Sequence, residues 1–562
     1  MRKPMLEIQP KFLTLADMLN KRLFEIPDYQ RAYSWTSRER QELFDDIEST
    51  FRKGEGASHF MATVVCLHKR KIRLGTDVYD QLDIVDGQQR LTTLILLLNA
   101  TKLALDPDQS EQERDYNWIS ELLVKEESDS LLLLQTNHDS SDYFADFLRE
   151  EKEEQPDKAK TLADRELLTA IRDCREFVEN WVKKRPLLQL ITCIKNQLCF
   201  ILHEISDEKL VYTVFEVLNS RGIEVSWLDR LKSMLMGKAF ELENTDRDRL
   251  ISDLHIIWSK IYKTIGLRQG LSTEALRFAA TLFQSGPPSR PLSERDAVDT
   301  FRASANDAKS IRKVARWLLS VTDACDKVIS NRRQNAVTRI SQARLLAVAI
   351  HLRDDIRESV RSKLLRRWEK VTFRIYGMMG YDARTRVGDY VRLAWKVARR
   401  KLAVSGIHSE IQRIGKGFPI GNAVESLRGA DCYEQWENEL RYFMYRYEEH
   451  LTHEAGQKFR NEQWERIWEK SASDSIEHIS PQKTAPDDIK HVLGNLMILP
   501  PKLNSQLQDK TPREKRPAYQ KTGLLSAIEV ASILESKPRW PKKVVREREE
   551  KLLEWAAREW AD

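Results

Sequence analysis

The chain has 562 residues, which is too long for a single hydrophobic core and predicts three or four folded units at roughly 100–200 residues per domain. Apolar residues make up 41% and charged residues 32%, so the chain can build folded cores beneath an unusually polar surface. The formal charge of +6 is the small difference between 92 basic and 86 acidic residues, and it indicates no particular class of partner.

Neither a membrane span nor a secretory signal is predicted. The longest uncharged apolar run, residues 91–98, is far shorter than the ~18 residues that cross a bilayer. Residues 1–12 begin with basic side chains but contain no apolar segment and no small-residue cleavage site. The six cysteines form no C-x-x-C pair, which favours buried free thiols. We therefore expect a cytoplasmic protein without a membrane partner.

The first hundred residues combine strand and helix patterns, which predicts an α/β region. Residues 59–70 alternate like a strand, a second strand ends near residue 86, and residues 40–54 and 91–105 have helical periodicity. The segment DGQQR, residues 86–90, therefore lies at a strand-to-helix junction.

The DGQQR junction has the residue types of a phosphate site. Backbone N–H groups at the start of a helix favour phosphate, and Arg90 can contact it in a bidentate manner. Asp86 could hold a metal or position water, and Gln88 and Gln89 could orient a nucleophile. A tight turn that caps the helix explains Asp86 and Gly87 equally well.

An aromatic segment, IPDYQRAYSW, precedes this junction at residues 26–35. Tyr29, Gln30, Arg31, Tyr33 and Trp35 could stack on a base or line a pocket around a modified group of DNA. In the alternative, the aromatic rings belong to the core and Arg31 pairs with a carboxylate. We favour the first interpretation because aromatic, amide and basic side chains in one turn-rich loop rarely all face inward.

The middle of the chain is predicted to be helical. Charged stretches between about 110 and 210 read as solvated helices and linkers. A third motif, NSRG, lies within residues 215–236, although such a turn can also be a helix stop. From about 245 to 450 nearly every segment has apolar residues at i, i+3 and i+4, which predicts an all-helical block.

The final hundred residues predict a hairpin followed by a helix, with a nuclease-like set of side chains. His478 is followed by Asn495 and then Asn504, the order of an H-N-N signature. A neutral imidazole can deprotonate water for attack on a phosphodiester, and one divalent metal can stabilise the charge that develops on the phosphate. We expect His478 to be the base, Asn495 to orient its loop through backbone hydrogen bonds, and Glu477 and Asn504 to bind Mg²⁺ or Mn²⁺.

Each of these residues has an ordinary alternative. A single histidine is more often a satisfied core or surface residue, and a single asparagine is more often a turn residue. Lys515 and Arg516 on the next helix could hold DNA phosphates, or could be a solvated face. The joint spacing favours the nuclease interpretation.

This segment resembles the C-terminal domain of GmrSD-type restriction endonucleases, a branch of the HNH (His-Me finger) nucleases. The resemblance covers roughly the last hundred residues and implies a ββα-metal module. Relatives commonly carry an asparagine five residues after the equivalent of Asn504, where this chain has Asp509, which is still a candidate metal ligand.

The three N-terminal motifs occur in the order found in the GmrSD-type N-terminal domain, which resembles the ParB/sulfiredoxin-like fold. That resemblance covers roughly the first 240 residues and implies hydrolysis of GTP or another NTP, together with sensing of modified DNA. It also implies a nucleotide site, whose members would be Asp86, Gly87, Gln88, Gln89, Arg90, Asn219, Ser220, Arg221 and Gly222.

The predicted protein is mainly α with an α/β N-terminal domain. Its expected parts are a ParB-like nucleotide-binding and DNA-sensing domain at 1–245, a helical linker domain at 246–450 and an HNH-type nuclease domain at 451–562. The predicted function is nucleotide-dependent cleavage of modified or phage double-stranded DNA. One HNH site cuts one strand, so a double-strand break would need a homodimer or rebinding.

Two other functions remain open. The N-terminal domain could merely bind nucleotide or DNA while the nuclease acts alone as a nickase. Alternatively, the chain is a nucleotide-controlled DNA-binding regulator of ParB type that does not cleave.

Overall fold

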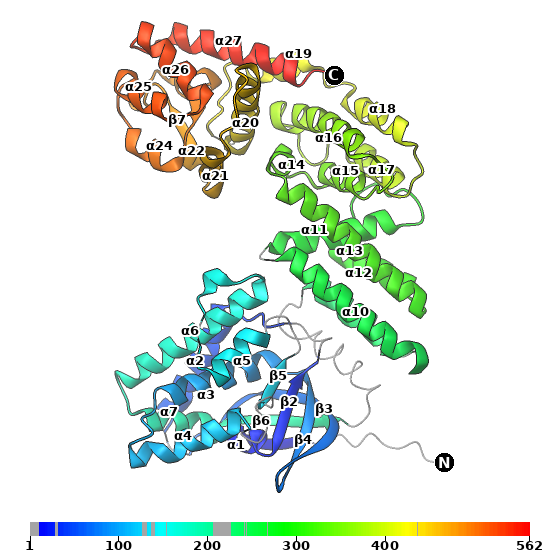
Figure 1. The fold of residues 1–562 in the computed structure, drawn as a ribbon, viewed down its shortest axis with the longest axis vertical. Coiled ribbons are helices and arrows are strands. Elements are labelled where there is room, and N and C mark those ends of the chain that lie inside the picture. Colours follow the sequence, from blue (N-terminus) through cyan, green and yellow to red (C-terminus); the bar gives the residue numbers. More distant parts are fainter. Residues whose placement is uncertain are drawn as a thin grey trace. The chain divides into compact units, whose positions relative to one another are not determined.

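The computed structural model describes residues 10–562 except 28–31, 55, 126–131, 137–140, 153, 206–225, 241, 243, 267 and 435. The chain forms two compact units, and both are discontinuous in sequence. The first comprises Met1–Leu276 and Glu294–Thr322, and the second comprises Arg277–Ser293 and Asp323–Asp562. The protein is mainly helical, as predicted, with one mixed sheet in the first unit (Figure 1). Within the described residues, no helix is long and apolar enough to span a bilayer.

The six-stranded sheet of the first unit has the order β1-β6-β3-β4-β2-β5. Its strands are β1 Pro10–Thr14, β2 Arg22–Ile26, β3 His59–Leu74, β4 Asp77–Asp86, β5 Leu134–Thr136 and β6 Leu198–Ile205. β3 pairs antiparallel with β4 and parallel with β6, so β3 and β4 form a long hairpin at the centre of the sheet. Both strands of this hairpin were predicted from their alternation.

Helices gather on one side of this sheet (Figure 1). They are α1 Leu15–Leu19, α2 Ser37–Arg52, α3 Gln88–Leu103, α4 Ser110–Leu123, α5 Ser141–Arg149, α6 Leu162–Val182 and α7 Leu187–Thr192, with the short η1 Pro156–Lys158 and η2 Cys193–Gln197. α3 is buried along almost its whole length because it packs against α4, α6 and α7. Its buried threonines remain satisfied, since Thr93 and Thr101 donate to the carbonyls of Gln89 and Leu97.

Two buried elements lie between and after the charged stretches of 110–210, and one of them, β6, was not predicted. α6 contributes a row of fully buried side chains to the core, among them Leu168, Ile171 and Cys174. β6 lies inside the sheet between β1 and β3. A short apolar run has the same appearance in a buried strand as in a buried helix, so periodicity alone does not identify β6.

The rest of the first unit consists of α9 Trp227–Phe240, α10 Asn244–Ile265, α12 Glu294–Ser304 and parts of α11 Gln269–Phe283 and α13 Ala308–Ser330. The second unit continues with α14 Arg332–Val337, α15 Ser341–His351, α16 Glu358–Thr372, η3 Phe373–Met378, α17 Val387–Ala398, α18 Val404–Gly415, α19 Ile420–Leu427 and α20 Glu437–Glu454. The described residues between 245 and 450 therefore form only helices and loops, which confirms the predicted all-helical block.

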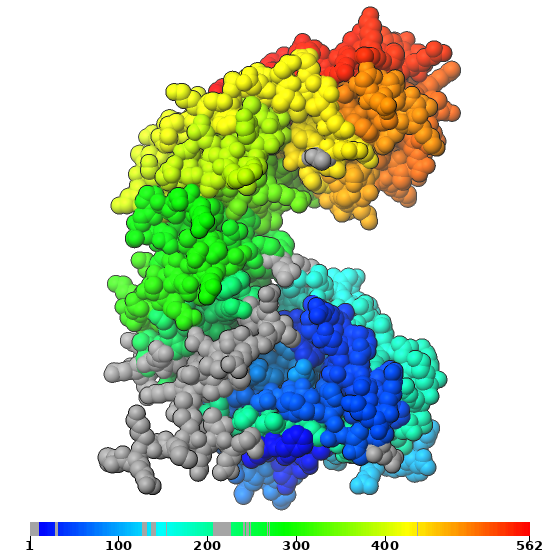
Figure 2. Space-filling model, turned by 180° about the vertical axis from the view of Figure 1, so that it is seen from behind, coloured from blue at the N-terminus to red at the C-terminus, as the bar shows by residue number. Residues whose placement is uncertain are grey.

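The C-terminal module contains a two-stranded hairpin, seven α-helices and one 3-10 helix. Its elements are α21 Asn461–Glu469, α22 Ala472–Ser475, β7 Ile476–His478, α23 Asp487–Lys490, η4 Leu493–Asn495, β8 Leu496–Ile498, α24 Pro501–Leu507, α25 Pro512–Lys521, α26 Leu525–Ser536 and α27 Lys542–Glu559. α19 packs against α27, and α20 packs against α22, α26 and β8. The yellow surface of the preceding helices accordingly continues into the orange surface of the module (Figure 2). The predicted boundaries at 245 and 450 stay predictions.

Candidate functional site

The hairpin of β7 and β8 positions His478. The two strands are antiparallel, with Ile476 opposite Ile498 and His478 opposite Leu496. Both strands are fully buried because apolar residues fill the positions around the two polar ones. The carbonyl of His478 accepts a hydrogen bond from Lys515 Nζ at 2.7 Å, which fixes the end of β7.

The imidazole of His478 is only 5% exposed and has a partner at each nitrogen. Its Nε2 lies 3.0 Å from Nδ1 of His491, and its Nδ1 lies 3.1 Å from Nε2 of Gln482. Burial lowers the pKa of His478 to about 3, and the neighbouring His491 and Lys515 act in the same direction. The ring is therefore neutral near pH 7, the form that can accept a proton.

A loop outside the hairpin completes the surroundings of His478. The ring of Tyr433, from the segment before α20, stacks on His491 with centroids 5.0 Å apart and meets His478 edge-on at 4.7 Å. The amide of Cys432 donates to the carbonyl of His491 at 2.8 Å. No sequence pattern indicated Tyr433, His491 or Gln482 as site residues, although Gln482 belongs to the same EHISPQ segment as His478.

Asn495 makes the backbone hydrogen bonds expected of it. Its Oδ1 accepts from the amide of Ser480 at 2.8 Å, and its Nδ2 donates to the carbonyls of Ser480 and Lys490. The side chain is fully buried, so these bonds connect the two ends of the loop between β7 and β8. The amide of Ile479 also donates to the carbonyl of Asn495, at 2.9 Å.

Asn504 ties α24 to the start of β7. Its Nδ2 donates to the carbonyls of Asp474 and Ile476 at 2.9 and 3.0 Å. No residue in the described part of the chain donates a hydrogen bond to its Oδ1.

Glu477 points into the interior beside two residues of α25. Its Oε1 lies 2.8 Å from Lys515 Nζ and accepts a hydrogen bond from the hydroxyl of Tyr519 at 2.6 Å. Burial raises the pKa of Glu477, while Lys515 and Tyr519 oppose that shift. Hydrogen bonds from the described residues reach only Oε1, so Oε2 keeps its lone pairs.

Two oxygen atoms that accept no hydrogen bond from the described residues, Glu477 Oε2 and Asn504 Oδ1, are suitable ligands for a divalent metal. Within the described residues there is no group of three or more His, Cys, Asp or Glu side chains that could hold a metal ion. Glu477 Oε2 and Asn504 Oδ1 nevertheless come from adjoining positions, because Asn504 is bonded to the carbonyl just before Glu477. Carboxylate and amide oxygens are the ligands that Mg²⁺ and Mn²⁺ prefer. Water would have to supply the remaining ligands.

Three other C-terminal residues that were predicted to bind DNA or metal, Lys515, Arg516 and Asp509, are paired with other side chains. Lys515 is fully buried in its ion pair with Glu477, so its predicted contact with a DNA phosphate is wrong for this conformation. Arg516 pairs with Glu535 at 3.2 Å. Asp509 is exposed and pairs with Lys483 at 2.7 Å, and no contact in the described residues joins it to Glu477 or Asn504.

At the N-terminal junction, β4 ends at Asp86 and α3 begins at Gln88, as predicted. Gly87 between them adopts a left-handed conformation with φ 95°. The left-handed backbone favours glycine, and a Cβ atom on Gly87 would lie 3.1 Å from Cγ2 of Val64, which would have to shift to make room. Gly87, the residue that precedes α3, has no side chain with which to cap the first turn of the helix.

Gln89 joins the DGQQR junction to the aromatic segment. Its Oε1 accepts from the amide of Ser34 at 2.7 Å, and its Nε2 donates to the carbonyl of Ala32 at 3.2 Å. Both ends of the amide are thus committed to backbone, which does not fit the predicted role of orienting a nucleophile. Arg90 lies over the ring of Trp35, 5.5 Å from its centroid.

The described aromatic residues of this segment belong to the core. Tyr33 and Trp35 are buried, and the Tyr33 hydroxyl lies 2.8 Å from Oγ1 of Thr93 on α3. The alternative that these two rings belong to the core is therefore confirmed. Gln89 on α3 also holds the segment, because it bonds the backbone of Ala32 and Ser34. Tyr29, Gln30 and Arg31 lie outside the described residues, as do Asn219, Ser220, Arg221 and Gly222.

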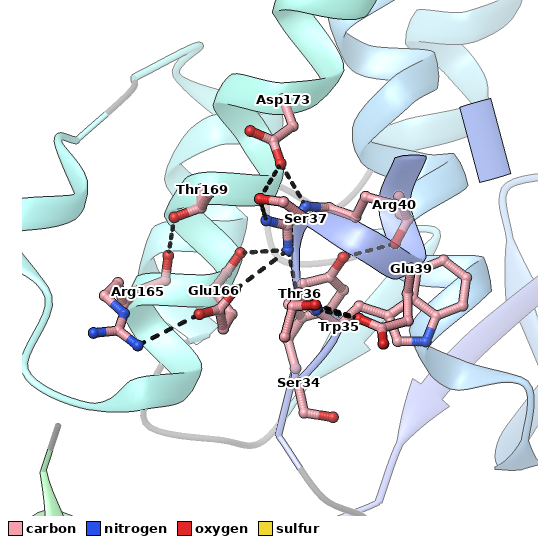
Figure 3. A network of polar contacts seen from close by, with 12 residues as sticks. Ser34, Trp35, Thr36, Ser37, Glu39, Arg40, Arg165, Glu166, Thr169 and Asp173 are labelled. Carbon is pink, nitrogen blue, oxygen red and sulfur yellow. Dashed lines mark hydrogen bonds and ion pairs between the residues drawn. The ribbon is translucent and has the colours of Figure 1, made fainter. Parts of the chain in front are cut away.

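A buried arginine anchors the end of the aromatic segment (Figure 3). Arg40 donates from Nε to Asp173 of α6 at 2.8 Å, from one terminal nitrogen to Ser37 Oγ at 3.0 Å, and from the other to the carbonyl of Trp35. The segment from Trp35 into α2 is thereby fixed to α6, which holds Trp35 beneath Arg90.

Two family models match the chain. Residues 15–236 match the model of the GmrSD restriction endonuclease N-terminal domain, and residues 422–555 match that of the C-terminal domain. The second match includes Tyr433, His478, His491 and Asn504. A comparison with curated proteins finds no match.

Proposed function

Because the chain belongs to the GmrSD restriction endonucleases and carries both of their domains, we propose that its C-terminal module cuts DNA with His478 as general base. A DNA endonuclease that acts in restriction follows from the family itself. The proposal depends on one observation above all, the neutral imidazole of His478 on the β7–β8 hairpin, directly after Glu477 in β7.

The residues of this module have distinct parts in the reaction. The neutral ring of His478 takes a proton from water as the water oxygen attacks phosphorus. Asn495 holds the loop that follows His478 through its bonds to Ser480 and Lys490. Glu477 and Asn504 would hold a Mg²⁺ or Mn²⁺ ion, which supplies stabilisation of the negative charge on the phosphate and leaving oxygen.

The N-terminal unit is proposed to bind and hydrolyse GTP or another NTP and so to control cleavage of modified DNA. The start of α3 directly after Gly87 and the half-buried guanidinium of Arg90 support a phosphate site there. Asp86, at the end of β4, is the carboxylate nearest to this turn in the sequence. Gln89 is assigned a structural part, because it bonds Ala32 and Ser34.

Cleavage of a plasmid panel tests the nuclease proposal. Purified full-length protein is incubated with unmodified plasmid or with plasmids carrying phosphorothioate, methylated, hydroxymethylated or glucosylated DNA. The buffer contains Mg²⁺ or Mn²⁺, with and without GTP or ATP. His478→Ala should reduce cutting by roughly 10²–10⁴-fold, whereas the exposed His453→Ala should not.

The outcomes separate the functions. Nucleotide-sensitive cutting of one modified class, lost in His478→Ala, supports the proposal and identifies the target, and the ratio of nicked to linear product distinguishes a nickase. Full cutting by His478→Ala contradicts the assignment of the base. Binding to DNA without cutting under any condition favours the ParB-type regulator instead. If a Gln88→Ala, Arg90→Ala double variant hydrolysed NTP at the wild-type rate, the proposed nucleotide site would be contradicted.

A further inference from the structure

We propose that His491 is a positioning residue that fixes the tautomer of His478, so that Nδ1 of His478 is the atom that removes the proton from water. In the conformation described here, the side chain of Gln482 occupies the position of that water. The inference rests on the proposed function, since it assigns the working atom of its general base.

The two ring nitrogens of His478 have hydrogen-bond partners that are held with different firmness. A neutral imidazole carries one N–H and one lone pair, so only one nitrogen can act as the base. Nε2 faces His491 and Nδ1 faces Gln482, at 3.0 and 3.1 Å. Whichever partner leaves more readily exposes the nitrogen that can meet water.

His491 is held from several directions. Its carbonyl accepts from the amide of Cys432 at 2.8 Å, and its ring is stacked by Tyr433 with an interplanar angle of 11°. The carboxylate of Asp431 in turn accepts hydrogen bonds from the amides of Tyr433 and Glu434 at 2.8 and 2.9 Å, which fixes that loop. His491 is therefore a lasting neighbour of Nε2.

Gln482 is held far less firmly. Its side chain is exposed, and its bond to His478 is the one hydrogen bond that this side chain makes within the described residues. Because an exposed side chain with one bond changes rotamer readily, water can replace the amide. The Gln482 amide donates to Nδ1, which is also what a water molecule must do before it loses a proton.

The positions of the protons follow from this difference between the two partners of His478. The N–H of His478 is on Nε2 and donates to His491 Nδ1, which leaves the lone pair on Nδ1. When water attacks, its O–H bond breaks, an N–H bond forms at Nδ1, and the oxygen lone pair forms the bond to phosphorus as the sugar oxygen departs. The imidazolium then carries two N–H groups, and His491 accepts the one at Nε2. This is the general arrangement in which a third group orients a base.

Single-turnover cleavage by full-length variants tests the inference. His491→Phe keeps a flat ring against Tyr433 but removes the acceptor, and His491→Gln restores an acceptor. We expect His491→Phe to lower the single-turnover rate constant by on the order of 10–100-fold, with the half-saturating protein concentration unchanged, as for outer partners that orient a histidine. His491→Gln should recover part of that loss. Gln482→Ala should raise the rate, because it removes the group in the position of water.

The tautomer itself can be read by ¹⁵N NMR of histidine-labelled protein, with His478→Ala used to assign the signal. The wild type should show His478 with the proton on Nε2, and His491→Phe should show a mixture of tautomers even if its activity is lost for another reason. A proton on Nδ1 in the wild type, or a tenfold loss in Gln482→Ala, would overturn the inference. Failure of the proposed function is distinct, because His478→Ala would then still cut DNA.

Discussion

A few side chains in each unit have properties set by burial rather than by their chemical type. His478 is neutral because burial, together with the neighbouring His491 and Lys515, disfavours its charged form. Glu477 and Lys515, which lie next to it, are buried as an ion pair. Either charge would be unfavourable in the interior without the other. Such residues couple the stability of the module to pH and to substitution.

Acid should destabilise the protein through His478. Its folded pKa of about 3 lies below the ~6.5 of an unfolded histidine, so between these values the unfolded chain binds the extra proton. The stabilisation is complete above pH ~6.5 and is lost as pH falls toward 3. At about pH 5 the loss should be about 2 kcal/mol.

Urea unfolding at pH 7.5 and pH 5 measures this effect. His478→Gln is the matched variant, because it removes the titrating ring while the other histidines remain. The free energy of unfolding should fall more steeply with acid in the wild type than in His478→Gln. Equal falls in the two proteins would contradict the shifted pKa.

Gly87 should tolerate alanine poorly for two separable reasons. Gly87→Ala adds a Cβ in a left-handed conformation and places it 3.1 Å from Val64. Gly54→Ala is the control, since Gly54 has a similar φ of 91° but no atom within 4 Å. We expect Gly54→Ala to cost about 1 kcal/mol of unfolding free energy and Gly87→Ala about 1–3 kcal/mol more. Thermal denaturation checks the difference, and equal losses would show that Val64 simply moves away.

At the scale of elements, α27 holds the hairpin in place from behind. Arg548 on α27 is buried and donates from one terminal nitrogen to the carbonyls of Leu493, Gly494 and Leu496. The helix approaches so closely that a Cβ on Gly494 would lie 2.0 Å from the carbonyl oxygen of Val545. The last helix of the chain thus supports β8, the partner strand of His478.

Replacing Arg548 should loosen that support. Arg548→Met fills similar space but leaves three buried carbonyls without this donor, which should lower the free energy of unfolding by about 3 kcal/mol. Arg558→Met, at an exposed position of the same helix, should have little effect. Hydrogen exchange of the β8 amides gives the local readout. Similar exchange in both variants would mean that other contacts hold the hairpin.

At the scale of the whole molecule, neither compact unit is continuous in sequence. Residues 294–322 belong to the first unit, where α12 packs against α9. Phe301, Ile311 and Leu318 in this stretch are fully buried. Cutting the chain between the predicted domains would therefore expose apolar surface.

This arrangement predicts the behaviour of two fragments. A fragment of residues 1–245 lacks α12, so it should expose the buried side of α9 and aggregate. A fragment of residues 1–322 should be monomeric and more resistant to protease. Size-exclusion chromatography and limited proteolysis compare them, and a stable monomer from residues 1–245 would contradict the expected dependence on α12.

The sequence by itself determined those features that depend on near neighbours in the chain. Alternation and helical periodicity predicted β3, β4, α2, α3 and the helical middle, because side-chain direction in each element follows from its local geometry. The order of His478, Asn495 and Asn504 indicated a nuclease, and Gly87 marked the turn before α3.

Only the tertiary structure decided which distant residues meet. His491, Gln482 and Tyr433 surround His478 although no local pattern marks them, and Gln89 and Lys515 are committed to the interior although their types suggested contact with ligands. The physical reason is that burial and hydrogen-bond partners depend on packing between elements far apart in the chain, which local periodicity does not encode.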